Sequence, residues 1–279
     1  RQWEKHGPGG PYVIERPKVL YNSETRHFVM WFHLERPGYR YRQVGVAQST
    51  SPTGPFEFVK AFKPDGVGSL DMSLFKDPVD GQAYFVRSCN NNYTAISRLS
   101  RDYLSTTGII STHGVVEGMA LFRHKNGTYY MVTSHLTGWS PNPLMLLRAA
   151  GPTLDDPQWV DMGNPTGSHT SFNSQSAWVG SPTSYNSQPA WVVHYTPASG
   201  EEPYFIYMAD DWVHCANEDG STEDWYTGPL INACYIWLPM AFDDEGGLVT
   251  IPWRKSWDLE RPFPAANSTA GPRGCVRTS

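Results

Sequence analysis

The sequence predicts an all-β fold and, within that class, a β-propeller. Short strands rich in aromatic and β-branched residues alternate with polar turns along the 279-residue chain. The resulting hairpins recur at a spacing near 50 residues, with 56, 46 and 57 positions separating Val19, Phe75, Leu121 and Trp178 in turn. A β-sandwich with similar hairpins is the alternative. A recurring hairpin unit of this length without helical periodicity favours the propeller.

Four hairpins are expected in chain order, each with two apolar strands joined by a polar turn such as Asn126-Gly127. Their strands are 18–21 and 28–32, 73–75 and 83–86, 119–122 and 129–132, and 177–179 and 190–193. Further strands are expected at 43–47 and 144–147, and a C-terminal piece is expected at 235–238 and 251–253. We expect a propeller domain over residues 1–260 and a tail over 261–279.

Composition excludes several classes of protein. The chain has 22 Lys and Arg against 27 Asp and Glu, a net charge of −5, so it lacks the positive excess of a nucleic-acid binder. It has no run of about 18 apolar residues, so no membrane span is predicted. Its nine His residues show no zinc-binding spacing, and no phosphate-binding glycine loop occurs. We therefore expect neither a metal nor a cofactor.

Cysteines and glycosylation sequons predict a secreted protein. None of the four Cys forms a C-x-x-C pair, and Cys215 and Cys234 flank a loop rich in Asp, Glu, Gly and Ser, so we expect these two to form a disulfide. N-x-S/T sequons occur at Asn92, Asn126 and Asn267.

Acidic residues stand just before the first strand of three successive units. They are Glu15, Asp71 and Glu117, and the same place in the fourth unit holds an amide, Gln175. The innermost strands of a propeller line its axis, so equivalent positions converge on one pocket. Crowding and burial of carboxylates hold one of them protonated near neutral pH, as a glycosidase general acid requires. Taken singly, each acid could instead be a solvated turn residue.

Several segments together resemble glycoside hydrolase family 43, and within it the exo-β-1,3-galactanase branch. They extend over most of the chain, from about residue 12 to 258. The segments are VIERPKV (13–19), LDMSLFKD (70–77), SHLTGWSPN (134–142), FNSQS (172–176), YMADDW (207–212) and YIWLP (235–239).

The resemblance implies a five-bladed propeller and an inverting glycosidase. It implies Glu117 as general acid and Asp71 as the residue that orients it and tunes its pKa. The branch resembled lacks the carboxylate base of most family members, and Gln175 is expected to hold the attacking water. Glu15 is expected to bind the sugar in the first subsite. Further expected sugar contacts are Arg16, Tyr39, Asn91 and Thr137, together with Trp139, whose indole could stack on a sugar face or pack under its loop.

The sequence departs from the family pattern at three places. Gly118 and Met119 follow the expected acid where family members have Ala and Pro, and Leu70 precedes Asp71 where an Arg is common. The family's residues before the Glu-Arg-Pro segment are absent. We therefore expect an incomplete first blade, or one completed by another chain, in a processed or partial protein that opens at Arg1.

The expected activity is release of galactose from β-1,3-galactan of the arabinogalactan type. Arabinan and xylan remain alternative substrates. The second hypothesis is a non-catalytic propeller that binds carbohydrate or acts as a scaffold. The presence of polar residues at this position in all four units, namely Glu15, Asp71, Glu117 and Gln175, favours the enzyme. A non-catalytic protein has no physical need to keep a buried acid cluster.

Overall fold

The protein is described by a computed structural model, which describes residues 12–138, 142–169, 171–178, 194–198, 200, 202–211, 234–243, 247, 249–254 and 256–263. Strands dominate these residues, and the helical structure among them is two short 3₁₀ turns, Pro64–Gly66 and Ser171–Asn173. No helix in this part of the chain has the length and apolar character needed to cross a membrane.

The strands form four antiparallel sheets. The first three sheets have four strands each, and consecutive strands are neighbours in every case. The first sheet contains β1 (Val13–Asn22), β2 (His27–Glu35), β3 (Gln43–Ser49) and β4 (Glu57–Phe62). The second contains β5 (Ser69–Lys76), β6 (Ala83–Cys89), β7 (Tyr93–Leu99) and β8 (Thr106–His113). The third contains β9 (Glu117–Arg123), β10 (Tyr129–Ser134), β11 (Leu144–Ala149) and β12 (Trp159–Asp161).

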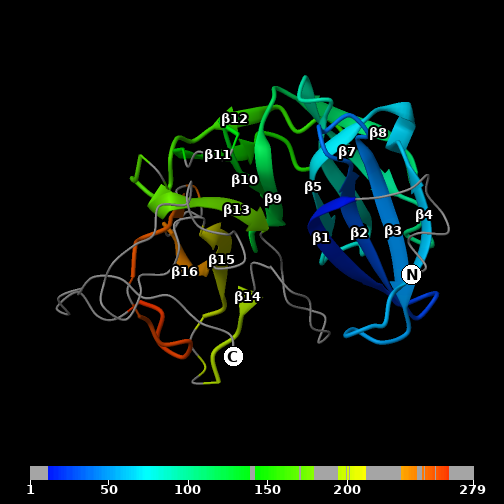
Figure 1. The fold of residues 1–279 in the computed structure, drawn as a ribbon. Coiled ribbons are helices and arrows are strands. Elements are labelled where there is room, and N and C mark those ends of the chain that lie inside the picture. Colours follow the sequence, from blue (N-terminus) through cyan, green and yellow to red (C-terminus); the bar gives the residue numbers. More distant parts are fainter. Residues whose placement is uncertain are drawn as a thin grey trace, which may run out of the picture.

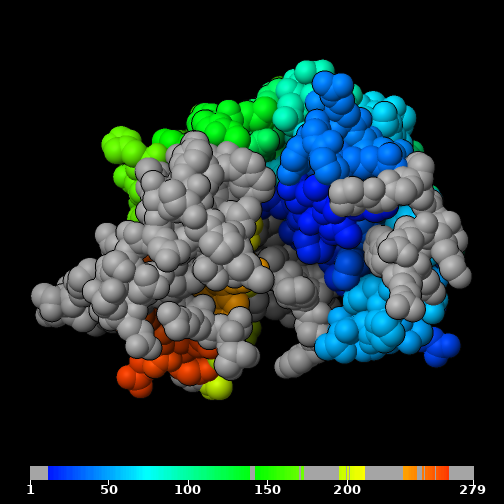
Figure 2. Space-filling model, viewed as in Figure 1, coloured from blue at the N-terminus to red at the C-terminus, as the bar shows by residue number. Residues whose placement is uncertain are grey.

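The fourth sheet has the order β13-β15-β16-β17, with β14 also paired to β15. Its strands are β13 (Ser174–Trp178), β14 (His194–Tyr195), β15 (Tyr204–Asp211), β16 (Cys234–Phe242) and β17 (Val249–Thr250). The first strands β1, β5, β9 and β13 lie on the inner side, and the sheets follow one another around a common centre (Figure 1). The space-filling view shows the same order as a continuous band from blue through cyan to green (Figure 2). This is the predicted propeller, with four blades in the described residues, and not the sandwich alternative.

The first three predicted hairpins and both predicted outer strands are confirmed. The fourth, 177–179 and 190–193, falls mostly outside the described residues. The predicted C-terminal piece is corrected in two ways. The 235–238 segment lies in β16 and pairs with β15 inside the fourth blade, and residues 251–253 follow β17 without joining a strand. The first sheet has all four of its strands hydrogen-bonded in order, and the expectation of an incomplete first blade stays a prediction.

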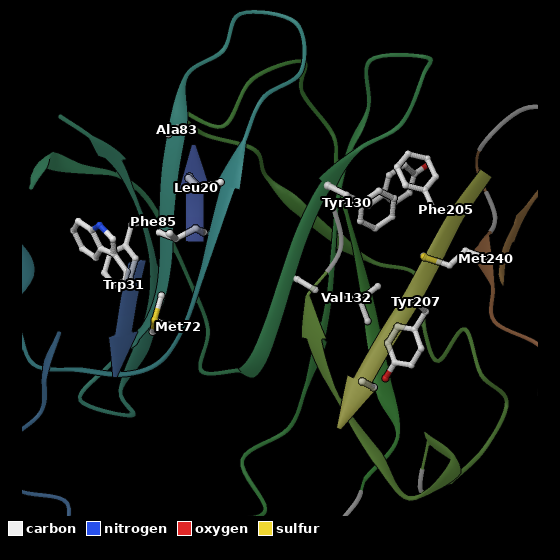
Figure 3. Packing of buried hydrophobic residues seen from close by; sticks show 14 of the residues in the cluster. Leu20, Trp31, Met72, Ala83, Phe85, Tyr130, Val132, Phe205, Tyr207 and Met240 are labelled. Atoms are coloured by element: carbon white, nitrogen blue, oxygen red, sulfur yellow. The ribbon is translucent and has the colours of Figure 1, made fainter. Parts of the chain in front are cut away.

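Aromatic contacts fill the spaces between blades. Trp31 of the first blade lies 4.8 Å from Phe85 of the second, measured between ring centroids, and donates its indole N–H to the Tyr103 carbonyl at 2.8 Å. Phe122 of the third blade lies 5.2 Å from Phe205 of the fourth. Figure 3 shows Trp31 beside Phe85, and Tyr130 on the side of Phe205. These blade-to-blade contacts fix the inner strands relative to one another.

A β-bulge interrupts the inner strand of every blade. In β1, Glu15 and Lys18 pair with His33 and Trp31, so three steps on β1 oppose two on β2. The ladders of β5, β9 and β13 each contain a corresponding extra residue, between Ser69 and Met72, between Glu117 and Ala120, and between Ser176 and Trp178. Bulges bend a strand and redirect its side chains, and they are common beside active sites.

Candidate active site

The bulged ends of β1, β5 and β9 open onto one cavity of about 420 Å³, within the usual range for small-molecule sites. It brings together the three acids singled out in the sequence, Glu15, Asp71 and Glu117. The other lining residues are Arg16, His33, Tyr39, Arg42, Leu70, Asn91, Gly138 and Asp210.

Asp71 is held by contacts from two blades. Its Oδ2 accepts the Gly118 N–H at 3.0 Å and lies 3.1 Å from the Arg16 Nη2. Burial of Asp71 opposes its charge, but the Arg16 guanidinium and the Gly118 amide outweigh that cost and lower the pKa of the carboxyl group. Asp71 therefore stays ionised, and its hydrogen bond fixes the backbone next to Glu117.

Arg16 links the first blade to two others. Its Nη2 contacts Asp71, and its Nη1 lies 3.2 Å from Asp210 Oδ2 in the fourth blade. The residue adopts a left-handed backbone, φ 53°, within the β1 bulge. Burial opposes the charge of Arg16, but the two carboxylates outweigh this and raise the pKa of the guanidinium. A buried cation thus partly neutralises a cavity that contains four carboxylates.

Glu15 is oriented from two sides. Its Oε2 lies 3.1 Å from His33 Nδ1, and its Oε1 accepts the Tyr39 hydroxyl. Burial, followed by the hydrogen bond to Glu15, raises the pKa of Tyr39, so the phenol remains a donor. Both Glu15 oxygens are therefore engaged by the protein.

Glu35 positions the loop that brings Tyr39 to the cavity. This fully buried carboxylate accepts the backbone N–H groups of Arg36 and Tyr41 at 2.9 Å each, and that of Arg42 at 2.5 Å. Arg42 in turn donates its Nε–H to the Tyr39 carbonyl at 3.1 Å. The loop is therefore fixed by the side chain of one buried residue, Glu35.

Glu117 begins β9, and hydroxyl groups of β10 hold its backbone. Its carbonyl accepts Thr133 Oγ1 at 2.6 Å and Ser134 Oγ at 3.3 Å. The side chain lines the cavity beside Asp71 and Arg16. This arrangement presents a carboxyl group at the cavity wall on a backbone fixed by three hydrogen bonds, the third being that between Gly118 and Asp71.

The remaining predicted residues occupy different places. Asn91 lines the cavity and accepts Ser88 Oγ at 2.9 Å. Thr137 is exposed and accepts Asn142 Nδ2 at 2.7 Å, while its neighbour Gly138 reaches the cavity. Gln175 lies in β13, opposite Asp210 of β15, and its side chain falls outside the description. Trp139 lies outside the described residues.

Sequence reasoning missed His33, Arg42 and Asp210. A signal existed for two of them in the strand register. His33 stands opposite Glu15 in the first hairpin, and Asp210 stands opposite Gln175 in the fourth blade. Arg42 reaches the cavity because of the conformation of its loop, and no sequence pattern predicts that conformation. Among the described residues, no group of three or more His, Cys, Asp or Glu is arranged to hold a metal ion.

The structure describes only some of the residues named in the cysteine and sequon predictions. Cys89 is a buried free thiol, whereas Cys215 and the side chain of Cys234 lie outside the described residues, so their pairing stays a prediction. Asn126 is exposed in the β9–β10 turn, as expected, and its Oδ1 accepts the Thr128 N–H at 3.0 Å.

Comparison with known proteins places the chain among glycosidases. The family profile of glycosyl hydrolases family 43 matches residues 20–210. No curated protein matches the sequence. An exo-β-1,3-galactanase from Phanerochaete chrysosporium, solved with galactose, is 30% identical with a TM-score of 0.67, over 86% of this chain and 48% of its own.

Two further solved structures agree. An exo-β-1,3-galactanase from Clostridium thermocellum is 28% identical, with a TM-score of 0.71, over 87% of this chain and 49% of its own. A family 43 β-1,3-galactosidase, solved with galactodeoxynojirimycin, is 30% identical, with a TM-score of 0.70, over 91% and 79%. The chain spans about half the length of the two galactanases. With the family profile matching more than half of its residues, the chain belongs to glycoside hydrolase family 43.

Proposed function

We propose that this chain is an inverting exo-β-1,3-galactanase that releases galactose from β-1,3-galactan, as in the backbone of arabinogalactan. The observation that carries the proposal is the hydrogen bond from the Gly118 amide to Asp71, which fixes the backbone beside Glu117 in a cavity shared with Glu15 and Arg16. Galactanase and galactosidase relatives at 28–30% identity support the substrate class.

In the proposed reaction, Glu117 donates its proton to the glycosidic oxygen as the bond to the leaving sugar breaks. Asp71 remains ionised, because Arg16 and the Gly118 amide stabilise its charge. Its negative charge beside Glu117 favours the protonated form of the acid. Water attacks the opposite face of the sugar in a single displacement.

Gln175 holds that water, and a held water reacts faster because its orientation is already established. Glu15, fixed by His33 and Tyr39, accepts hydrogen bonds from sugar hydroxyls in the first subsite. Further proposed sugar contacts are Arg16, Tyr39, Asn91, Thr137 and Trp139.

The test combines activity with stereochemistry. Glu117→Gln should lose hydrolysis of β-1,3-galactan while keeping its fold and galactose binding, because the amide keeps the shape but has no transferable proton. Proton NMR of fresh wild-type product should show α-galactose first. Initial β-galactose would exclude inversion, and a Glu117→Gln variant with more than a few per cent of wild-type activity would remove Glu117 from the role.

The second candidate is a non-catalytic carbohydrate-binding propeller. The observation in its favour is that the fourth inner strand offers the amide Gln175 where hydrolysis calls for a base. This candidate predicts galactose binding without any release of sugar from galactan. The same released-sugar assay therefore separates the two functions.

The proposal extends to ring closure and secretion. The family's fifth blade would come from outside the described residues or from another chain. Tyr235 and Trp237 of β16, with 48% and 39% of their surfaces exposed, offer an apolar face for it. Secretion with glycans on the exposed Asn92 and Asn126 would appear as a mobility shift on enzymatic deglycosylation of protein from its native host.

A further inference from the structure

The proposed reaction needs a proton acceptor for the attacking water, and Gln175 is a poor one because a neutral amide has almost no basicity. A base must be an ionised group that reaches the cavity and has a free oxygen for the water. Besides Glu117, three carboxylates line the cavity, namely Glu15, Asp71 and Asp210.

Two of these carboxylates are less available to the water than the third, Glu15 by its contacts and Asp71 by its burial. Glu15 uses one oxygen for His33 and the other for the Tyr39 hydroxyl. Asp71 receives Arg16 and the Gly118 amide on the same oxygen, and only 17% of its side chain is exposed. In the proposed reaction Asp71 already orients the backbone of the acid, through its hydrogen bond from the Gly118 amide.

Asp210 differs in its contacts, exposure and position. Arg16 contacts its Oδ2 at 3.2 Å, and Oδ1 makes no hydrogen bond to another described residue. Its side chain is 31% exposed, the most of the three. In the β13–β15 ladder Asp210 is the direct partner of Gln175, and such partners have Cα atoms about 4.5–5.5 Å apart.

We propose that Asp210 is the general base of the reaction and acts on the water that Gln175 holds. The assignment rests on the proposed function, since it requires that water attack a galactoside in this cavity. As the water oxygen bonds to the anomeric carbon, one water proton passes to the Asp210 carboxylate. The bond to the leaving sugar breaks, and its oxygen takes the proton of Glu117. Glu117 ends ionised and Asp210 ends protonated, and exchange with solvent restores both.

Arg16 makes this proton transfer compatible with a crowded site. Its guanidinium is shared between Asp71 and Asp210, so one cation faces two carboxylates. When Asp210 takes a proton and loses its charge, Arg16 retains an ionic partner in Asp71. The same ion pair holds the Asp210 carboxylate in place at the cavity before the reaction.

The decisive variant is Asp210→Asn, whose amide oxygen can still accept from Arg16 but has no useful basicity. On β-1,3-galactan its kcat should fall by about 10²-fold or more, with KM within about threefold of wild type and with an unchanged unfolding midpoint. The acidic limb of its pH–rate profile should disappear. Sodium azide, a nucleophile that needs no base, should restore turnover of an aryl β-galactoside and yield α-galactosyl azide. Asp161→Asn, the same change at an exposed position on β12, should behave as wild type.

Two results would overturn the assignment. A kcat within threefold of wild type would show that Asp210 takes no proton. A large rise in KM without azide rescue would make Asp210 a support for Arg16 only. If the wild-type chain itself releases no galactose, the proposed function fails first, and the assignment of a base fails with it.

Discussion

Asp77 joins the second blade to the third, and replacing it with Ala tests how the blades that bear Asp71 and Glu117 are held together. The side chain is fully buried at the end of β5. It accepts Arg123 Nη1 at 3.0 and 3.3 Å and also accepts the Tyr129 hydroxyl, both from the third blade.

The expected cost follows from what the substitution leaves behind. Asp77→Ala removes the charge partner of Arg123, whose side chain is only 19% exposed, together with the acceptor of the buried Tyr129 hydroxyl. Removing one member of a buried ion pair costs about 3–5 kcal/mol. The Val79 amide, which donates to Asp77 at 2.8 Å, loses its acceptor as well.

The assay is urea unfolding followed by tryptophan fluorescence, which reports on the buried Trp31. Asp155→Ala is the matched control, because it also removes an Asp–Arg pair between the second and third blades. Its Arg98 Nη2–Asp155 Oδ1 distance is 2.6 Å, but the two side chains are 36% and 55% exposed, so less than about 1 kcal/mol should be lost. Equal costs for the two variants would refute the argument that burial makes the Asp77 contacts strong.

Three further predictions concern the first two blades. Asp71→Asn should lower kcat on galactan by about 10²-fold. It should also move the basic limb of the pH–rate profile to lower pH, because the negative charge that favours protonated Glu117 is gone. A basic limb that stays at the wild-type pH would contradict this. Gly45→Ala should cost about 1–3 kcal/mol in urea unfolding, since a Cβ there would lie 2.1 Å from the buried Phe32 ring; no loss would mean that the ring moves freely. Burial, followed by the charge of Arg16, lowers the pKa of Lys18 from 10.5 to about 8. Between these pH values the unfolded chain binds more protons than the folded protein, so the free energy of unfolding rises with pH. Lys18→Met should be more stable than wild type at pH 7 and should lack this rise, as urea unfolding at pH 7 and pH 9 would show; a wild-type curve without the rise would contradict it.

The parts of the fold that sequence predicts are those encoded locally. A strand such as 119–122 and a turn such as Asn126-Gly127 identify themselves within a dozen residues, and the first three blades follow from them. The pairing of β15 with β16 joins segments far apart in the chain, and no local pattern assigns residues 235–238 to the fourth blade. Long-range pairing is decided by packing. For this reason the prediction of a separate C-terminal piece at 235–238 and 251–253 was wrong.

The site was predictable in its acids and not in the residues that hold them. Glu15, Asp71 and Glu117 occupy one position in successive repeats, so a propeller necessarily brings them together. His33 and Asp210 enter the cavity from β2 and β15, each the neighbour of the inner strand in its sheet. Finding them requires the register of each hairpin, and a shift of one residue reverses which face a side chain occupies.

The bulges explain why even a correct register would have given an incomplete site. In a regular strand neighbouring residues point to opposite faces, so Glu15 and Arg16 could not both line one cavity. They do so, as do Leu70 and Asp71, because each pair lies within a bulge that adds one residue to the inner strand. Arg16 reaches its two carboxylates from a left-handed backbone at φ 53°, a conformation that costs a non-glycine residue about 1–2 kcal/mol. The contacts from Arg16 to Asp71 and Asp210 offset that cost. The charges that the proposed reaction requires therefore also stabilise the strained backbone of Arg16.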